Sequence, residues 1–257
     1  EYLQSLNGGR NLPEILGYDI ETNSLLTKPI YGGDVIESLK GFDSIERING
    51  MMQPYIDLQN QADVTILAQF GARTYKTEDL YELCRQAFRD MLPCLHVASS
   101  IRLEAIVKHF SSTKQHFVDF VSANTLPDRL EHSDFHLGNI LMRDEQYVFI
   151  DFAECAIANP IFSFMSFRDS LIKRLELDFE SLTIDLCTSW YIDYMAKTFN
   201  TTTSHVGNLV AYAHEVYPFY YLLTMRDLIV TAYNKTGTPF RTGRFEDTIA
   251  ALYAKFN

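Results

Sequence analysis

Apolar and polar positions follow two periods along this chain, and the two periods predict different elements. Near the N-terminus, two extended pieces at residues 12–18 and 24–30 flank the polar turn 19–23, which is typical of a β-hairpin. Beyond them, apolar residues recur mainly at helical spacing. We expect helices at about residues 77–91, 99–110, 112–123, 176–199 and 206–235, and from about 244. The pattern therefore predicts an α+β chain that is mainly helical.

A second hairpin is predicted around a charged turn. Two short apolar runs, residues 139–142 and 147–150, flank the turn 143–146. If the turn is centred near Glu145, residues whose numbers sum to 290 face each other, and Asn139 lies opposite Asp151. Directly opposed residues in an antiparallel pair have Cβ atoms about 4.5–5.5 Å apart. An amide oxygen and a carboxylate would then share one divalent cation.

The oxygen donors of this hairpin suit Mg²⁺, which takes a few protein oxygens and completes its shell with water and phosphate. Asp134 lies five residues before Asn139, in a stretch with neither strand nor helix pattern. A carboxylate in such a loop can accept the proton of a hydroxyl group while the metal neutralises a transferring phosphoryl group. We therefore predict a phosphoryl-transfer site at Asp134, Asn139 and Asp151.

The composition and net charge limit the classes of ligand that the chain can be expected to bind. The chain has 257 residues, of which 47% are hydrophobic, enough to build a core of one large domain or two small ones. Its net charge of −11 disfavours nucleic acid as a partner and favours cationic or neutral ligands. We see neither a signal peptide nor a membrane span, and expect a cytoplasmic protein. Its scattered cysteines should be reduced thiols: Cys84, Cys94, Cys155 and Cys187.

A metal-dependent hydrolase is an alternative interpretation of the same stretch. His132 and His136 could bind Zn²⁺ or Fe²⁺, which imidazole suits. The two residues lack the His-Glu-x-x-His pattern, however, and Gly138 disfavours a helix through them. The hydrolase is therefore the weaker interpretation.

The segment 132–139, His-Ser-Asp-Phe-His-Leu-Gly-Asn, is followed at a distance by Ile-Asp-Phe at 150–152. Together they resemble the catalytic loop and metal-binding Asp of the aminoglycoside phosphotransferase and choline kinase family, which has a protein-kinase-like fold. The resemblance implies that Asp134 is the base or hydroxyl-orienting residue of the catalytic loop. It implies that His132 braces this loop. Asn139 and Asp151 would bind the Mg²⁺ that accompanies ATP or GTP.

Residues 25–32, Leu-Leu-Thr-Lys-Pro-Ile-Tyr-Gly, resemble the hinge strand in which this family holds adenine by backbone hydrogen bonds. The resemblance implies nucleotide binding at Thr27, Lys28 and Ile30, since the proline between the last two has no N–H to donate. It divides the chain into two parts. Residues 1–31 would be a remnant of an N-terminal lobe with the hinge, and 32–257 a helical C-terminal lobe carrying the catalytic hairpin.

The chain also departs from the family pattern. There is no room before residue 25 for the family's first three strands, so its phosphate-covering loop and phosphate-binding Lys would lie in a longer protein or be missing. Asn159 and Ser163 stand where the family usually has acidic residues, one of which ties down the catalytic loop. We expect Mg²⁺-dependent transfer of a γ-phosphoryl group from ATP or GTP to a hydroxyl of a small, cationic acceptor such as an aminoglycoside. The alternative is a catalytically impaired, kinase-like binding or scaffolding module.

Overall fold

The computed structural model describes residues 2–19, 21–22, 24–32, 35–39, 44–124, 126–240 and 243–256. The chain divides into two compact units, each made of two segments. The first unit comprises Glu1–Thr74 and Thr125–Gly207, and the second comprises Tyr75–Asn124 and Asn208–Asn257. The lobe boundary expected at residues 31–32 is a different division and stays a prediction.

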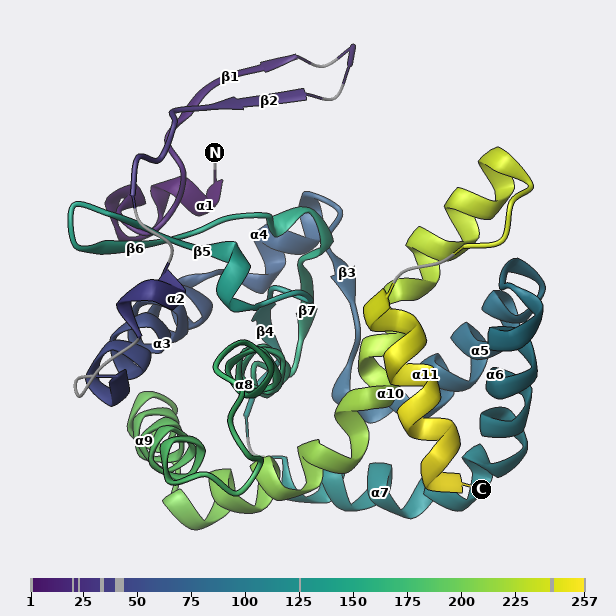
Figure 1. Ribbon diagram of the computed structural model, residues 1–257. Coiled ribbons are helices and arrows are strands. Elements are labelled where there is room, and N and C mark those ends of the chain that lie inside the picture. The colour runs from purple at the N-terminus through teal and green to yellow at the C-terminus, as the bar shows by residue number, and fades with distance from the viewer. Residues whose placement is uncertain are drawn as a thin grey trace. The chain divides into compact units, whose positions relative to one another are not determined.

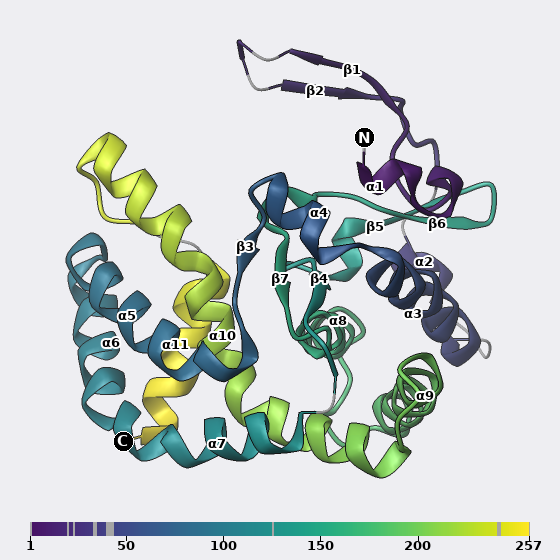
Figure 2. The same cartoon turned by 180° about the vertical axis from the view of Figure 1, so that it is seen from behind.

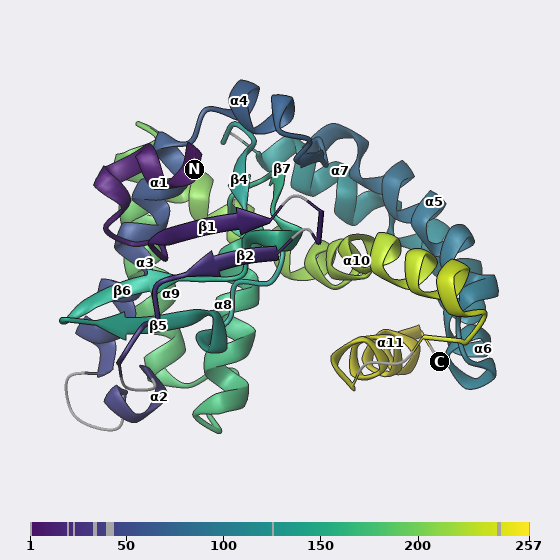
Figure 3. The same cartoon turned by 90° about the horizontal axis from the view of Figure 1, so that it is seen from above.

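The strands that the structure describes lie in the first unit (Figure 1). Two antiparallel hairpins are β1 (Ile15–Asp19) with β2 (Ser24–Thr27), and β5 (Ile140–Arg143) with β6 (Gln146–Phe149). Figure 3 shows β1 and β2 running in opposite directions. A third sheet has β7 (Ala156–Ala158) in its centre, parallel to β3 (Arg73–Thr74) and antiparallel to β4 (Arg129–Glu131).

The first unit also contains helices. They are α1 (Tyr2–Ser5), α2 (Val35–Ser38), α3 (Ser44–Gln61), α4 (Val64–Gln69), α8 (Ile161–Arg174) and α9 (Leu182–Thr198). Figures 1 and 2 show α9 beside α3, to which Tyr194 donates a hydrogen bond at Asp57 (2.7 Å). The ring of Tyr55 in α3 stacks on Phe135 at 3.8 Å between centroids, and Phe135 lies 5.6 Å from Phe167 in α8. Residues 132–139 are therefore anchored by a cluster of packed aromatic side chains from α3 and α8.

The second unit is helical. It contains α5 (Leu80–Met91), α6 (Val97–His109), α7 (Lys114–Ala123), α11 (Gly243–Phe256) and α10 (Thr203–Thr236), whose first residues belong to the first unit. Aromatic rings fill its core, with Phe219 of α10 lying 5.3 Å from Phe110 and 5.8 Å from Phe117 between ring centroids. Such rings bury much apolar area, which makes them the main source of stability in this unit.

The predicted class, α+β and mainly helical, is confirmed, as are both hairpins and the helices α5, α6, α7, α9, α10 and α11. The predicted start of one helix is wrong by six residues: α9 begins at Leu182 rather than near residue 176. Ser181 caps it there by accepting the N–H of Ile184 at 3.4 Å. Among the described elements, the helices α2, α3, α4 and α8 and the β3–β7–β4 sheet were not predicted.

The cysteines are unpaired thiols, as expected. Cys84, Cys94 and Cys187 are buried and Cys155 is half-buried. Within the described ranges, no helix combines the length and the apolar character needed to cross a bilayer.

Candidate active site

The register of the β5–β6 hairpin differs from the predicted one. Paired residues sum to 289, as in Ile140 with Phe149, because a two-residue turn at Asp144 and Glu145 connects the strands. Both turn residues have positive φ, 49° and 61°, which is the backbone of the tight turn that matches strand twist. The predicted pairing of Asn139 with Asp151 is therefore wrong by one residue. The N–H of Ile150 bonds instead to the carbonyl of Asn139 at 3.0 Å.

A left-handed backbone places Asp151 immediately after this hydrogen bond. Asp151 has φ 64° and ψ 55°, an uncommon conformation for a residue with a side chain, and it begins the 3₁₀ turn Phe152–Glu154. The residue is exposed, and its carboxylate makes no hydrogen bond or ion pair with any part of the chain that the structure describes. Strain at such a position is typical of functional sites.

Asn139 closes the loop that carries Asp134. The Asn139 side chain donates through Nδ2 to the carbonyl of Asp134 at 2.9 Å, and its backbone N–H donates to the carbonyl of His136 at 2.9 Å. With Nδ2 engaged, Oδ1 is the atom that remains for a metal ion. Asn139 is 7% exposed, so the amide is held in one orientation.

His132 joins the loop to the end of β6. Its ring is fully buried, Nε2 lies 2.8 Å from the carbonyl of Ile150, and the ring centroid lies 4.5 Å from that of Phe152. Burial lowers the pKa of His132, since it penalises the charged form more than the Ile150 carbonyl favours it. A neutral, buried imidazole supports the bracing role and does not face a substrate.

A buried polar network at Ser163 also braces the loop. Its Oγ donates to Glu131 Oε1 at 2.9 Å and accepts the backbone N–H of His132 at 3.3 Å. Tyr55 Oη lies 2.7 Å from the same oxygen, and Ser133 donates to Glu131 Oε2 at 2.8 Å. The carboxylate that the sequence lacks at 163 is thus supplied by Glu131, which is 1% exposed. The sequence alone does not indicate this role of Glu131, because Glu131 ends β4 and lies before the loop rather than after Asp151.

A cavity of about 830 Å³ opens at Asp151. Ile150, Phe152 and Thr27 line it, together with apolar side chains of α1, β1 and α4. This volume is within the range of sites for small ligands. Arg73 also lines the cavity, and its guanidinium pairs with Glu154 at 2.9 Å. No sequence signal marks Arg73, because β3 is only two residues long.

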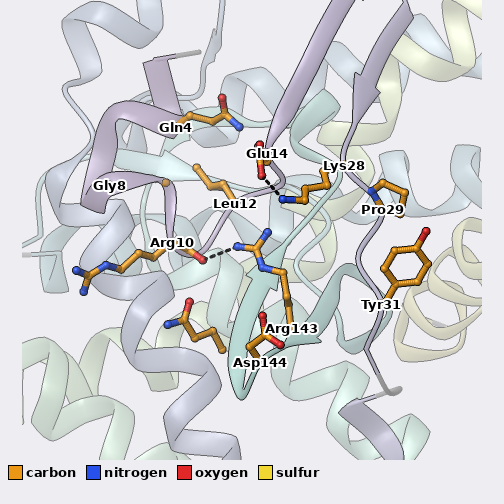
Figure 4. Close-up of a pocket in the computed structure, with 12 residues that line it drawn as sticks. Gln4, Gly8, Arg10, Leu12, Glu14, Lys28, Pro29, Tyr31, Arg143 and Asp144 are labelled. Atoms are coloured by element: carbon orange, nitrogen blue, oxygen red, sulfur yellow. Dashed lines mark hydrogen bonds and ion pairs between the residues drawn. The ribbon is translucent and has the colours of Figure 1, made fainter.

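Lys28 and Ile30, the other two residues of the predicted hinge, do not line the cavity at Asp151. Lys28 lines a second cavity, of about 670 Å³, where its ammonium pairs with Glu14 at 3.0 Å (Figure 4). Its backbone N–H is also used, since it donates to the Glu14 carbonyl at 2.8 Å. Figure 4 shows Arg143 directed to the carbonyl of Arg10 in the same cavity. Ile30 is half-buried and lines neither cavity.

The donor set near Asp151 fits Mg²⁺. Asn139 Oδ1 and the Asp151 carboxylate are hard oxygen ligands, and Mg²⁺ needs only a few of these besides water and phosphate. The two histidines do not act as a pair of ligands: Nε2 of His132 is bonded to a carbonyl, whereas His136 contacts Asp134 and Gly138. In the described residues, no three His, Cys, Asp or Glu side chains form a metal cluster.

Residues 56–179 match the sequence profile of the phosphotransferase enzyme family, APH, a range that includes Asp134, Asn139 and Asp151. The chain is similar in structure to a mutant of the aminoglycoside 2′-phosphotransferase IIIa in complex with GDP. The TM-score is 0.52 at 16% identity, over 99% of this chain and 80% of that chain.

A choline/ethanolamine kinase family protein from Mesorhizobium loti is more distant, with a TM-score of 0.46 at 13% identity over 95% of this chain and 79% of that chain. No curated protein matches the chain in sequence. At 16% identity the first likeness shows the fold alone, and it confirms the expected kinase-like fold.

Proposed function

We propose that this chain transfers a γ-phosphoryl group from ATP or GTP to a hydroxyl of a small acceptor, since residues 56–179 match the phosphotransferase enzyme family and the chain has a kinase-like fold. One observation carries the proposal. Asn139 ties itself to Asp134 through Nδ2 and to Ile150 through its carbonyl, so the candidate base and the residue before Asp151 share one hydrogen-bonded frame.

Asp134 is the group that receives a proton. As the acceptor oxygen forms its bond to the γ-phosphorus, the O–H bond breaks and the proton passes to the Asp134 carboxylate. The bond from the γ-phosphorus to the bridging oxygen breaks, and the nucleoside diphosphate leaves with that oxygen. The Asp134 side chain is 42% exposed, which suits a group that meets an incoming hydroxyl.

Asn139 and Asp151 are the proposed Mg²⁺ ligands. The bound ion would neutralise negative charge on the phosphates and orient them for in-line displacement. The protein's part is to present two oxygens from rigid positions: Asn139 is held by hydrogen bonds, and Asp151 by its left-handed backbone.

The nucleotide is proposed to bind along the cavity at Asp151, with Thr27 in its wall. The Lys28 N–H is already bonded to the Glu14 carbonyl, so Thr27 is the hinge residue proposed to contact the nucleotide in this cavity. ATP and GTP are both candidates, and the structural neighbour was solved with GDP. The acidic chain, at net charge −11, favours a cationic acceptor such as an aminoglycoside or a choline-like amine.

Calorimetric titration with ATP and GTP, with and without Mg²⁺, tests the proposal first. We expect Mg²⁺-dependent binding to the wild type that is lost in Asp151→Asn. Asp144→Asn is the matched control, because it removes the same charge from an exposed, left-handed residue of the nearby turn. Binding that does not depend on Asp151 would contradict the metal assignment.

Turnover separates an enzyme from a kinase-like binding module. Asp134→Ala should bind nucleotide as the wild type does but lose at least about 100-fold in kcat, the usual contribution of a general base. The acceptors to test are aminoglycosides, choline and water, with release of nucleoside diphosphate as the signal. Nucleotide binding without turnover in the wild type would favour the binding module, and an active Asp134→Ala variant would exclude Asp134 as the base.

A further inference from the structure

The imidazole of His136 is held between a backbone N–H and the candidate base. Its Nδ1 accepts the N–H of Gly138 at 3.0 Å, and its Nε2 lies 3.3 Å from Asp134 Oδ2. A backbone N–H can only donate, so Nδ1 carries a lone pair and the proton of the neutral ring is on Nε2. The backbone therefore selects the tautomer, and the selected tautomer presents a donor to Asp134.

Gly138 makes room for this ring. A Cβ atom at position 138 would lie 2.8 Å from His136 Cε1 and 3.0 Å from its Nδ1, so the imidazole would have to shift from its present place. The glycine is needed for close approach rather than for a left-handed backbone, since its φ is not positive. The His-Leu-Gly spacing at 136–138 thus has a physical reason that its sequence alone does not reveal.

The two histidines of the loop have different surroundings. His132 is fully buried and faces the Ile150 carbonyl. His136 and Asp134 have side chains that are 29% and 42% exposed, so their contact lies where an acceptor can reach. The structure assigns one histidine to the frame and the other to the reacting carboxylate.

We propose that His136 is a positioning residue that orients the Asp134 carboxylate by directing its Nε2–H at Oδ2, 3.3 Å away. This inference rests on the proposed function, because it names the group that prepares the base. Nε2 and Oδ2 are in contact at 3.3 Å, and contacts between catalytic groups often tighten into hydrogen bonds only when substrate binds. His136 itself neither gains nor loses a proton in the transfer.

Two substitutions separate positioning from packing. His136→Gln keeps an amide oxygen to accept the Gly138 N–H and an amide N–H to donate to Asp134, whereas His136→Leu keeps neither. We expect His136→Leu to lower kcat by about 10- to 100-fold, the usual loss when a partner that orients a reactive group is removed. The KM for nucleotide should change little. His136→Gln should restore most of kcat, and His205→Leu, an exposed histidine elsewhere, should leave it unchanged.

A spectroscopic readout tests the geometry without turnover. Long-range ¹H–¹⁵N NMR should show His136 as the Nε2–H tautomer, with an Nε2 resonance that shifts in Asp134→Asn. An Nδ1–H tautomer, an Nε2 signal indifferent to Asp134, or equal kcat values for His136→Leu and wild type would each overturn the assignment. If the wild type shows no phosphoryl transfer, the proposed function fails, and the NMR result still decides whether His136 orients Asp134.

Discussion

At the scale of single residues, Ser163 shows how a hydroxyl group supports a catalytic loop. Its one proton is donated to Glu131, so Tyr55 and the His132 N–H must both donate to its oxygen. Burial and the neighbouring Glu131 charge raise the pKa of Tyr55, which keeps the phenol in the donating form. The position could be identified from the sequence, but its three partners could not, because they come from two other segments.

Removing this hydroxyl should cost more than removing one of its donors. Ser163→Ala removes the hydrogen bonds that the hydroxyl makes with the buried Glu131 carboxylate and the buried His132 N–H, and we expect it to lower the free energy of unfolding by about 2–4 kcal/mol. Tyr55→Phe leaves Ser163 with its other partners and should cost about 1 kcal/mol. Urea unfolding measures both values. A Tyr55→Phe loss as large as that of Ser163→Ala would contradict the assignment of Ser163 as the centre of the network.

His132 should make stability depend on pH. Burial lowers the pKa of His132 below its usual 6.5, so the unfolded chain takes up a proton at higher pH than the folded one. Its contribution is fully present above pH 6.5 and is lost as pH falls below that value. We expect the free energy of unfolding to fall less steeply between about pH 6.5 and 5 in His132→Gln than in the wild type. His205→Gln, at an exposed site, should keep the wild-type slope.

At the scale of elements, the helical period of apolar residues detects only those helices that have one apolar and one polar face. Residues 161–168 of α8 are all buried, including its serines, so this stretch has no solvent-exposed face whose charged side chains would mark a helical period. Helix α3 contains Gly50 and Pro54, which usually mark the end of a helix, yet it runs from Ser44 to Gln61. Both helices are held by packing around the catalytic loop, which the sequence does not display.

The turn of the catalytic hairpin is strained and can be relieved. Glu145 has φ 61°, and a left-handed backbone costs a residue with a side chain roughly 1–2 kcal/mol. Glycine avoids this cost but loses about 0.5–1 kcal/mol more conformational entropy on folding, so the net gain is smaller than the strain. We expect Glu145→Gly to raise the free energy of unfolding by up to about 1 kcal/mol, measured by urea unfolding. Gln146→Gly, one residue later in β6, is the control and should be destabilising.

At the scale of the whole molecule, each of the two units has a hydrophobic core of its own. Phe219 is 2% exposed and is surrounded by rings of the second unit, so Phe219→Ala should cost about 3–5 kcal/mol there. Trp190, the single tryptophan, lies in α9 of the first unit. We expect the variant to lose helical circular dichroism at lower urea than tryptophan fluorescence changes. Coincident transitions would show instead that both units unfold as one cooperative structure.

The sequence by itself determined the local elements: the helical and hairpin periods, and the loop spacing that brings Asp134 near Asn139. These depend on neighbours within a few residues, where side-chain pattern and backbone preference act directly. Tertiary structure alone decided the rest. A two-residue turn shifted the hairpin by one position, so that Asp151 reaches the cavity through a left-handed backbone rather than by facing Asn139. Such long-range outcomes depend on contacts between segments distant in the chain, which no local pattern encodes.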